Sequence, residues 1–157
     1  MPNWIVGDLK VRGKKENIER FLLEGLSPVE FFGLSDEKVK IEKDEWSIAI
    51  SIEKSIGFYI HETHRHFINT KHIEFYYPEE GGKGVLVLEN FKAAWGIDAS
   101  SLAKLSKKYL IDFKILGFER GMQFNQDVEI VNGEIVKNEE IKFKDYTWEC
   151  IRPHIGG

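Results

Sequence analysis

The sequence predicts an α+β fold in which a mostly antiparallel, split βαβ sheet carries two helices on one face. The main observation is a unit that occurs twice, an apolar strand that runs directly into an amphipathic helix. It spans 4–12 and 14–26 in its first copy, and 85–95 and 99–109 in its second. More strand-like sequence follows each helix, which is the chain order of a split βαβ sheet. Because such folds host many unrelated functions, function has to be argued from a site.

The first strand and helix are recognised by a change of period. Leu9 and Val11 alternate with charged neighbours, which is typical of a half-buried strand. The apolar residues that follow recur at helical spacing, and they are Ile18, Phe21, Leu22 and Leu26. Ser27-Pro28 is expected to end this helix, because proline cannot continue it.

The region between the two units, 27–83, is too long for a simple crossover and is predicted to be an insertion that contains its own strands. Residues 46–53 alternate apolar and polar side chains without interruption, and 56–60 and 71–77 are further strand candidates. Eight of the eleven residues in 35–45 are Asp, Glu or Lys. We expect that segment to be a solvated loop or an edge strand.

The second unit and the C-terminal region complete a single domain over 1–157. Asp98 is a good N-cap for the second helix. Asn132-Gly133, between two apolar runs, is a strong hairpin signal and predicts an extra β-hairpin within 123–148. Residues 141–148 are expected to form the last strand.

Composition restricts the classes of partner and compartment. The 157 residues are 42% hydrophobic and carry a formal net charge of −4, so the chain lacks the basic excess of a duplex-binding protein. The single cysteine, Cys150, allows no intramolecular disulfide, which suits a reducing cytoplasm. No signal peptide and no apolar stretch of about 20 residues is recognisable. We therefore expect a cytoplasmic protein without membrane contact.

Three short motifs resemble the YubB ferredoxin-like domain family. They are the opening Met1-Pro2-Asn3-Trp4 with the helix after Gly13, Ala94-Trp95 with the helix ending at Tyr109, and 121–136 with its Asn132-Gly133-Glu134 turn. Together they cover most of the chain in pieces. The resemblance implies a ferredoxin-like fold and a small bacterial protein of phages or conjugative elements. It implies no established activity and no catalytic residues.

The densest group of candidate ligands is a cluster of four of the five histidines, His61, His64, His66 and His72. If 59–67 is a strand, Glu62, His64 and His66 point to the same face. Two imidazoles and a carboxylate are suitable ligands for Zn²⁺ or Fe²⁺. The alternative interpretation is a polar, exposed strand or turn, since Arg65 lies between two of the histidines.

Other candidate sites are weaker. Cys150 and His154 have no recognisable orienting acid, and the strand 85–90 carries Val85, Val87 and Asn90 where an RNA-recognition module needs aromatic residues. The leading hypothesis is a non-enzymatic protein-interaction module without a cofactor. Its partner is not identified by the sequence, and a second copy of the chain in a homodimer is one candidate. The first alternative is a metal binder or metal-dependent enzyme that uses the histidine cluster, and the second is a single-stranded nucleic-acid binder.

Overall fold

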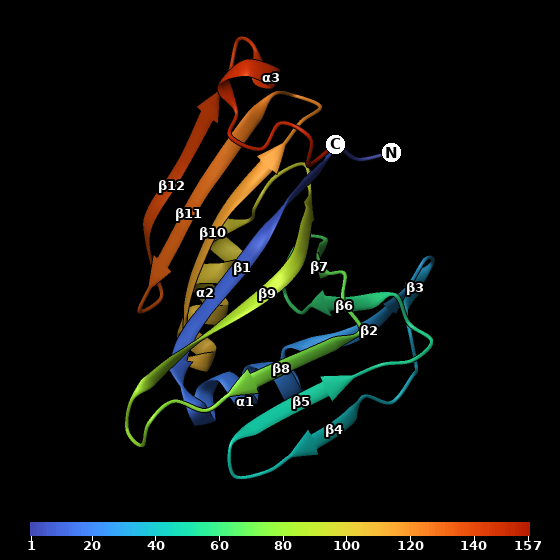
Figure 1. Cartoon of the computed structure of the whole chain (residues 1–157), viewed down its shortest axis with the longest axis vertical. Helices are drawn as coiled ribbons and strands as arrows, with labels where there is room; N and C mark the ends of the chain where they lie inside the picture. The colour runs from blue at the N-terminus through green and yellow to red at the C-terminus, as the bar shows by residue number, and fades with distance from the viewer.

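Two antiparallel sheets and three helices make up the chain (Figure 1). The computed structural model describes all residues 1–157. The helices are α1 (Lys15–Glu24), α2 (Ala99–Tyr109) and α3 (Tyr146–Glu149). The strands are β1 (Trp4–Lys14), β2 (Leu26–Glu30), β3 (Gly33–Leu34), β4 (Lys40–Lys43), β5 (Ser47–Ser51), β6 (Gly57–Ile60), β7 (His66–Ile68), β8 (His72–Tyr76), β9 (Lys83–Ala94), β10 (Asp112–Glu119), β11 (Phe124–Val131) and β12 (Glu134–Lys142). The predicted α+β, mostly antiparallel class is confirmed.

The larger sheet has nine strands in the order β12-β11-β10-β1-β9-β7-β6-β2-β3. β1 pairs with β9 on one side and with β10 on the other, and both pairings are antiparallel. β7 and β6, from the predicted insertion, lie between β9 and β2. In the simple split βαβ order, β2 would pair directly with β9. Here the β6–β7 hairpin lies between these two strands, so the simple order is not reproduced.

Both longer helices lie on the same face of this sheet, behind it in the view of Figure 1. Their buried stripes include Ile18, Phe21 and Leu22 of α1, and Leu102 and Leu105 of α2. These side chains belong to one hydrophobic core of 29 buried residues. On the opposite face, α3 and the C-terminal segment cover one end, where Phe118 is buried against Tyr146 and Cys150. Neither of the two longer helices covers this face, and its remaining part is uncovered (Figure 1). No helix has the length and apolar character needed to cross a membrane.

The first helix ends earlier than the sequence predicted. α1 stops at Glu24, and the Gly25 amide donates to the Phe21 carbonyl oxygen in the cap. Ser27 and Pro28 lie inside β2 instead of ending the helix. Gly25 explains the difference, because a Cβ at this position would come within 2.8 Å of the Phe21 ring and carbonyl oxygen. The chain therefore turns where glycine allows close approach, before it reaches the proline.

The smaller sheet has the order β4-β5-β8 and is built entirely from the insertion. Its Ile48, Ile50, Ile73 and Phe75 are buried in the same core as the larger sheet. The strand predicted within 46–53 is confirmed as β5, which covers Ser47–Ser51 and is buried on both faces, and the charged segment contains the exposed edge strand β4. The insertion thus adds a second sheet to the fold and contributes buried side chains to the shared core.

The predicted C-terminal hairpin forms, but the separate last strand predicted over 141–148 does not. β11 and β12 are joined by Asn132 and Gly133, with positive φ values of 52° and 77° that suit a tight hairpin turn. β12 ends at Lys142, and 146–149 form α3 instead of a strand. Asp145 accepts from the Trp148 amide, while Glu149 accepts from the Asp145 amide at 2.8 Å. This reciprocal capping stabilises a helical turn over the extended form.

We expect Leu110→Gly to raise the free energy of unfolding by about 0.5–1 kcal/mol. Leu110 caps the C-terminus of α2 with a left-handed backbone at φ 55°, which is strained for leucine. Its side chain is 68% exposed, so removing it costs little buried apolar area. Glycine relieves that strain but also increases the entropy of the unfolded chain, which leaves a modest net gain. Urea denaturation followed by circular dichroism measures it. Leu110→Ala is the control, since alanine keeps the strain, and a glycine variant less stable than the alanine variant would contradict the argument.

Candidate functional site

The histidine cluster lies around a turn and not along one strand. Residues 61–65 connect β6 to β7, with Glu62 and Arg65 in the left-handed region at φ 60° and 54°. A continuous strand over 59–67, the condition for a shared ligand face, is therefore absent, because these two residues reverse the chain between β6 and β7. As a result, Glu62, His64 and His66 are not presented from alternate positions of one strand face.

His66 is fully buried and has a partner at each ring nitrogen. The Asp98 amide donates to Nε2 at 2.9 Å, so Nε2 is the acceptor and the proton is on Nδ1. Nδ1–H then donates to the His64 carbonyl oxygen at 2.8 Å. Burial lowers the pKa of His66 and is only partly opposed by the His64 carbonyl and by the charge of Asp98. His66 is thus a neutral bridge between the β6–β7 turn and the start of α2.

The other predicted ligands have separate surroundings. His61 Nε2 lies 2.5 Å from Ser27 Oγ, and Glu62 Oε2 lies 3.2 Å from Lys108 Nζ. His64 and His72 are exposed. No group of three His, Cys, Asp or Glu side chains lies together in an arrangement that could hold a metal ion. The five predicted ligands are therefore not brought together into one coordination set.

Cys150 is also a packed residue. Its thiol is buried beside Asn125 at 3.7 Å, and Tyr146 packs in the same small cluster. His154 is exposed and makes no hydrogen bond with the thiol. The structure does not join the cysteine and the histidine into a nucleophile and base.

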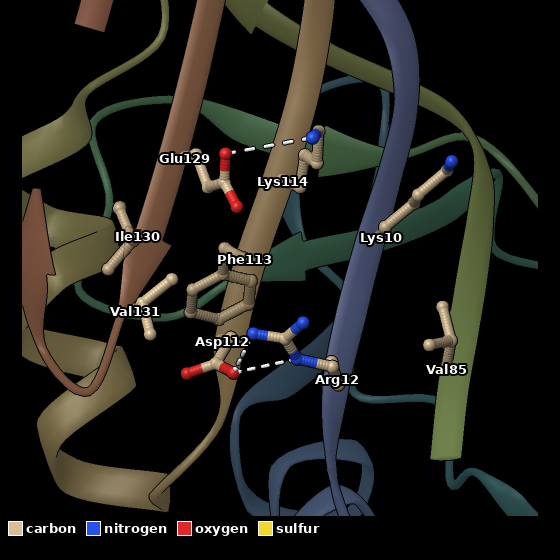
Figure 2. A pocket seen from close by; sticks show the side chains of 9 residues that line it. All are labelled: Lys10, Arg12, Val85, Asp112, Phe113, Lys114, Glu129, Ile130 and Val131. Atoms are coloured by element: carbon tan, nitrogen blue, oxygen red, sulfur yellow. Dashed lines mark hydrogen bonds and ion pairs between the residues drawn. The ribbon is translucent and has the colours of Figure 1, made fainter. Parts of the chain in front are cut away.

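The uncovered sheet face has a charged groove over β1, β10 and β11, with a volume of about 90 Å³ (Figure 2). Arg12 donates to Asp112 at 2.7 and 2.9 Å, and Lys114 Nζ lies 3.6 Å from Glu129. Figure 2 shows these two pairs across adjacent strands, with Lys10 apart from them. The groove is shallow and its charges are mostly paired within the sheet.

Asp112 joins this groove to the C-terminal hairpin. Its Oδ1 accepts from the Asn132 amide at 3.0 Å, while Oδ2 accepts from Arg12. Burial alone would raise the pKa of Asp112, but the Asn132 hydrogen bond and the Arg12 hydrogen bond and charge outweigh it and lower that pKa. These charges therefore hold β1, β10 and the hairpin turn together, which is a structural role.

A much larger hollow of about 740 Å³ lies toward the other end of the same face, and we call it the aromatic pocket. Its lining comprises Met1, Pro2, Trp4, Val29, Glu30, Phe31, Gly33, Leu34, Ile56, Tyr59, Arg65, Phe67, Asn69 and Lys92. Trp4, Tyr59 and Phe67 form a row of rings, with Phe67 centred 6.0 Å from Trp4 and 5.7 Å from Tyr59. A large, mainly apolar hollow with a few polar groups is the usual form of a binding site.

Two cations lie against these rings. Lys92 Nζ is 4.6 Å from the Trp4 ring centroid, and Arg65 Cζ is 5.5 Å from the centroids of both Trp4 and Trp95. These distances are within the range of cation–π attraction. Burial, with a smaller contribution from the charge of Arg65, lowers the pKa of Lys92. The rings hold two positive charges close together at one edge of the pocket.

The backbone beside the pocket is held in unusual conformations. Arg65, Asn90 and Trp95 all have positive φ, at 54°, 59° and 62°. Left-handed backbone costs a residue with a side chain roughly 1–2 kcal/mol, although asparagine tolerates it better. Such residues gather where a protein needs a particular side-chain placement. Here two of the three are the residues whose side chains stack, which marks this edge as a candidate site.

Sequence reasoning missed this pocket. Trp4, Phe67 and Lys92 come from β1, β7 and β9, strands that are far apart in the chain. Val85, the position where an RNA-recognition module would carry an aromatic residue, lines the charged groove and not the aromatic pocket. The one available signal was the alternation of β1, which places Trp4 on the face opposite the buried Ile5.

Comparison with protein-family models, with curated proteins and with solved structures found no match to this chain. The interpretation of the aromatic pocket accordingly rests on its geometry and chemistry.

We expect the folded protein to lose stability as the pH falls below about 6.5, and His66 to account for part of that loss. Because the pKa of His66 is lowered from 6.5 in the folded state, the unfolded chain takes up this proton first as the pH falls. The His66 contribution is complete above pH 6.5 and declines toward the lower folded pKa. His66→Gln keeps an acceptor for the Asp98 amide but cannot titrate.

Urea unfolding at a series of pH values from about 7 to about 5 measures the difference between the two proteins. The other four histidines are present in both, so their contributions cancel in the comparison. A variant with the same pH dependence as the wild type would contradict the role assigned to His66.

Proposed function

We propose that this chain is a non-enzymatic protein-interaction module that holds its partner in the aromatic pocket. The observation that carries the proposal is the 740 Å³ hollow on the uncovered sheet face, with aromatic lining and two cations at its edge. Phe31 and Leu34, from the tip of the β2–β3 hairpin, are 83% and 66% exposed at its rim. Exposed apolar side chains grouped beside a pocket are typical of interaction surfaces.

The state of the titratable side chains supports binding over catalysis. His66 has both ring nitrogens bonded, and Asp112 is held by Arg12 and the Asn132 amide. Cys150 is buried beside Asn125. These groups have structural partners, whereas the rings and cations of the pocket are placed at an accessible surface.

The finer fold and the origin of the protein belong to the same proposal. The order β10-β1-β9, with α1 after β1 and α2 after β9, supports a ferredoxin-like sheet into which the β6–β7 hairpin has been inserted. With the resemblance to the YubB ferredoxin-like family, this leads us to propose a cytoplasmic accessory protein of a bacterial mobile genetic element.

Single-stranded nucleic acid is the second candidate partner. Rings and cations on an open sheet face are the components that stack bases and contact phosphates. The net charge of −4 and the presence of only two cations in the pocket argue for a weaker affinity than such proteins show. This candidate is tested beside the first.

Selection of peptides from a random phage-displayed library on the immobilised full chain tests the proposal. We expect enriched peptides to bind the purified protein by fluorescence anisotropy. Phe31→Ser and Leu34→Ser should each weaken binding by about fivefold or more, since they remove apolar rim from the pocket. Both residues are exposed, so neither change should unfold the protein.

Trp46→Ser is the matched control, because Trp46 is 73% exposed beside the smaller sheet and does not line the pocket. We expect it to bind as the wild type does. Failure to enrich any peptide, or equal loss in the control and the rim variants, would contradict the proposed function. Binding of a labelled oligo-dT that is stronger than peptide binding would favour the second candidate.

A further inference from the structure

The two cations of the aromatic pocket have no anionic partner within the protein. Ten ion pairs join other side chains, yet neither Arg65 nor Lys92 takes part in one, and neither side chain makes a hydrogen bond. By contrast, Arg12 and Lys114 on the same sheet face are each paired with a carboxylate. In a chain with excess acid, two adjacent cations without a carboxylate are an unusual feature.

The acidic side chains nearby are occupied elsewhere. Glu30 lines the pocket, but its Oε1 accepts a hydrogen bond from Ser35 Oγ at 2.9 Å. Glu62, in the same turn as Arg65, pairs with Lys108 of α2. No carboxylate of the chain therefore forms an ion pair with Arg65 or Lys92, and partial burial of Lys92 makes its charge costly.

The cationic groups are positioned before any partner arrives. Arg65 lies between the rings of Trp4 and Trp95, at 5.5 Å from each centroid. The His66 bridge ties the His64 carbonyl, immediately before Arg65, to the start of α2. Because the guanidinium is already restrained, binding an anion there loses less side-chain entropy than binding to a free arginine would.

We propose that the aromatic pocket recognises a peptide segment in which an apolar or aromatic side chain is followed closely by an Asp or Glu carboxylate. The rings of Trp4, Tyr59 and Phe67 take the apolar side chain, and Arg65 and Lys92 bind the carboxylate. This inference rests on the proposed function and specifies its ligand. A charge-assisted contact beside an apolar anchor supplies specificity as well as affinity.

The surroundings favour a peptide with one such carboxylate over a polynucleotide. Glu30 contributes a carboxylate to the pocket lining. A row of phosphates would extend past the two cations toward this negative charge, whereas a single carboxylate beside an apolar anchor needs only the two cations. The large apolar lining also matches a side chain better than a sugar–phosphate backbone.

The test uses the enriched peptides and matched analogues in which Asp or Glu is replaced by Asn or Gln. We expect the full chain to prefer the acidic form by about tenfold, and the preference to shrink at high salt. Arg65→Gln and Lys92→Gln should each bind both forms about equally. Lys10→Gln is the matched control, because Lys10 is an unpaired lysine on the same face, in the charged groove (Figure 2). It should keep the full preference.

Each outcome has a distinct meaning. Peptides that bind, lose affinity in Phe31→Ser and show no acidic preference would overturn this inference and leave the proposed function standing. Equal loss of preference in Lys10→Gln would also overturn it, since the effect would then come from general charge. Oligo-dT that binds more tightly than the peptides, and is lost in Arg65→Gln, would assign the cations to phosphate instead. If no peptide binds, the proposed function and the inference fail together.

Discussion

The burial of one face of the nine-stranded sheet under α1 and α2, with the other face covered at the end where α3 packs and otherwise open, is the constraint on which the rest of this structure depends. Ile5, Leu9 and Val11 of β1 point toward α1 and α2 and are fully buried in the main core. The same strand alternation turns Trp4 and Arg12 to the uncovered face. Since antiparallel sheets tolerate a solvated face, no complete second layer is needed there, and the open part of that face is free to carry a site.

The insertion after α1 completes that site. Its β6–β7 hairpin pairs with β9, which places Phe67 opposite Lys92 in the register of the two strands. The turn between β6 and β7 brings Arg65 over the ring of Trp4, which belongs to β1. His66, the most buried member of the histidine cluster, anchors this turn through its two ring nitrogens. The cluster thus supports the pocket structurally, a role that its spacing in the sequence did not indicate.

Much of the fold could be predicted because local patterns and burial agree there. The alternation over 46–53 became β5, and Asn132-Gly133 became the hairpin turn with the positive φ values such turns require. The errors arose where a few contacts outweighed the pattern. Gly25 ended α1 through its close approach to Phe21, and the Asp145 and Glu149 caps replaced a predicted strand with α3. Of the candidate site, only the outward orientation of Trp4 was readable in advance.

The sequence by itself determined the α+β class, the two strand–helix units and the hairpin, because periodicity and turn chemistry act over a few neighbouring residues. Only the tertiary structure decided the strand order and the pocket. Trp4, Arg65 and Lys92 meet because β1, β7 and β9 pair across long stretches of chain. Pairing of this kind depends on which sheet edge is free and on packing against the shared core, and no local pattern carries that information.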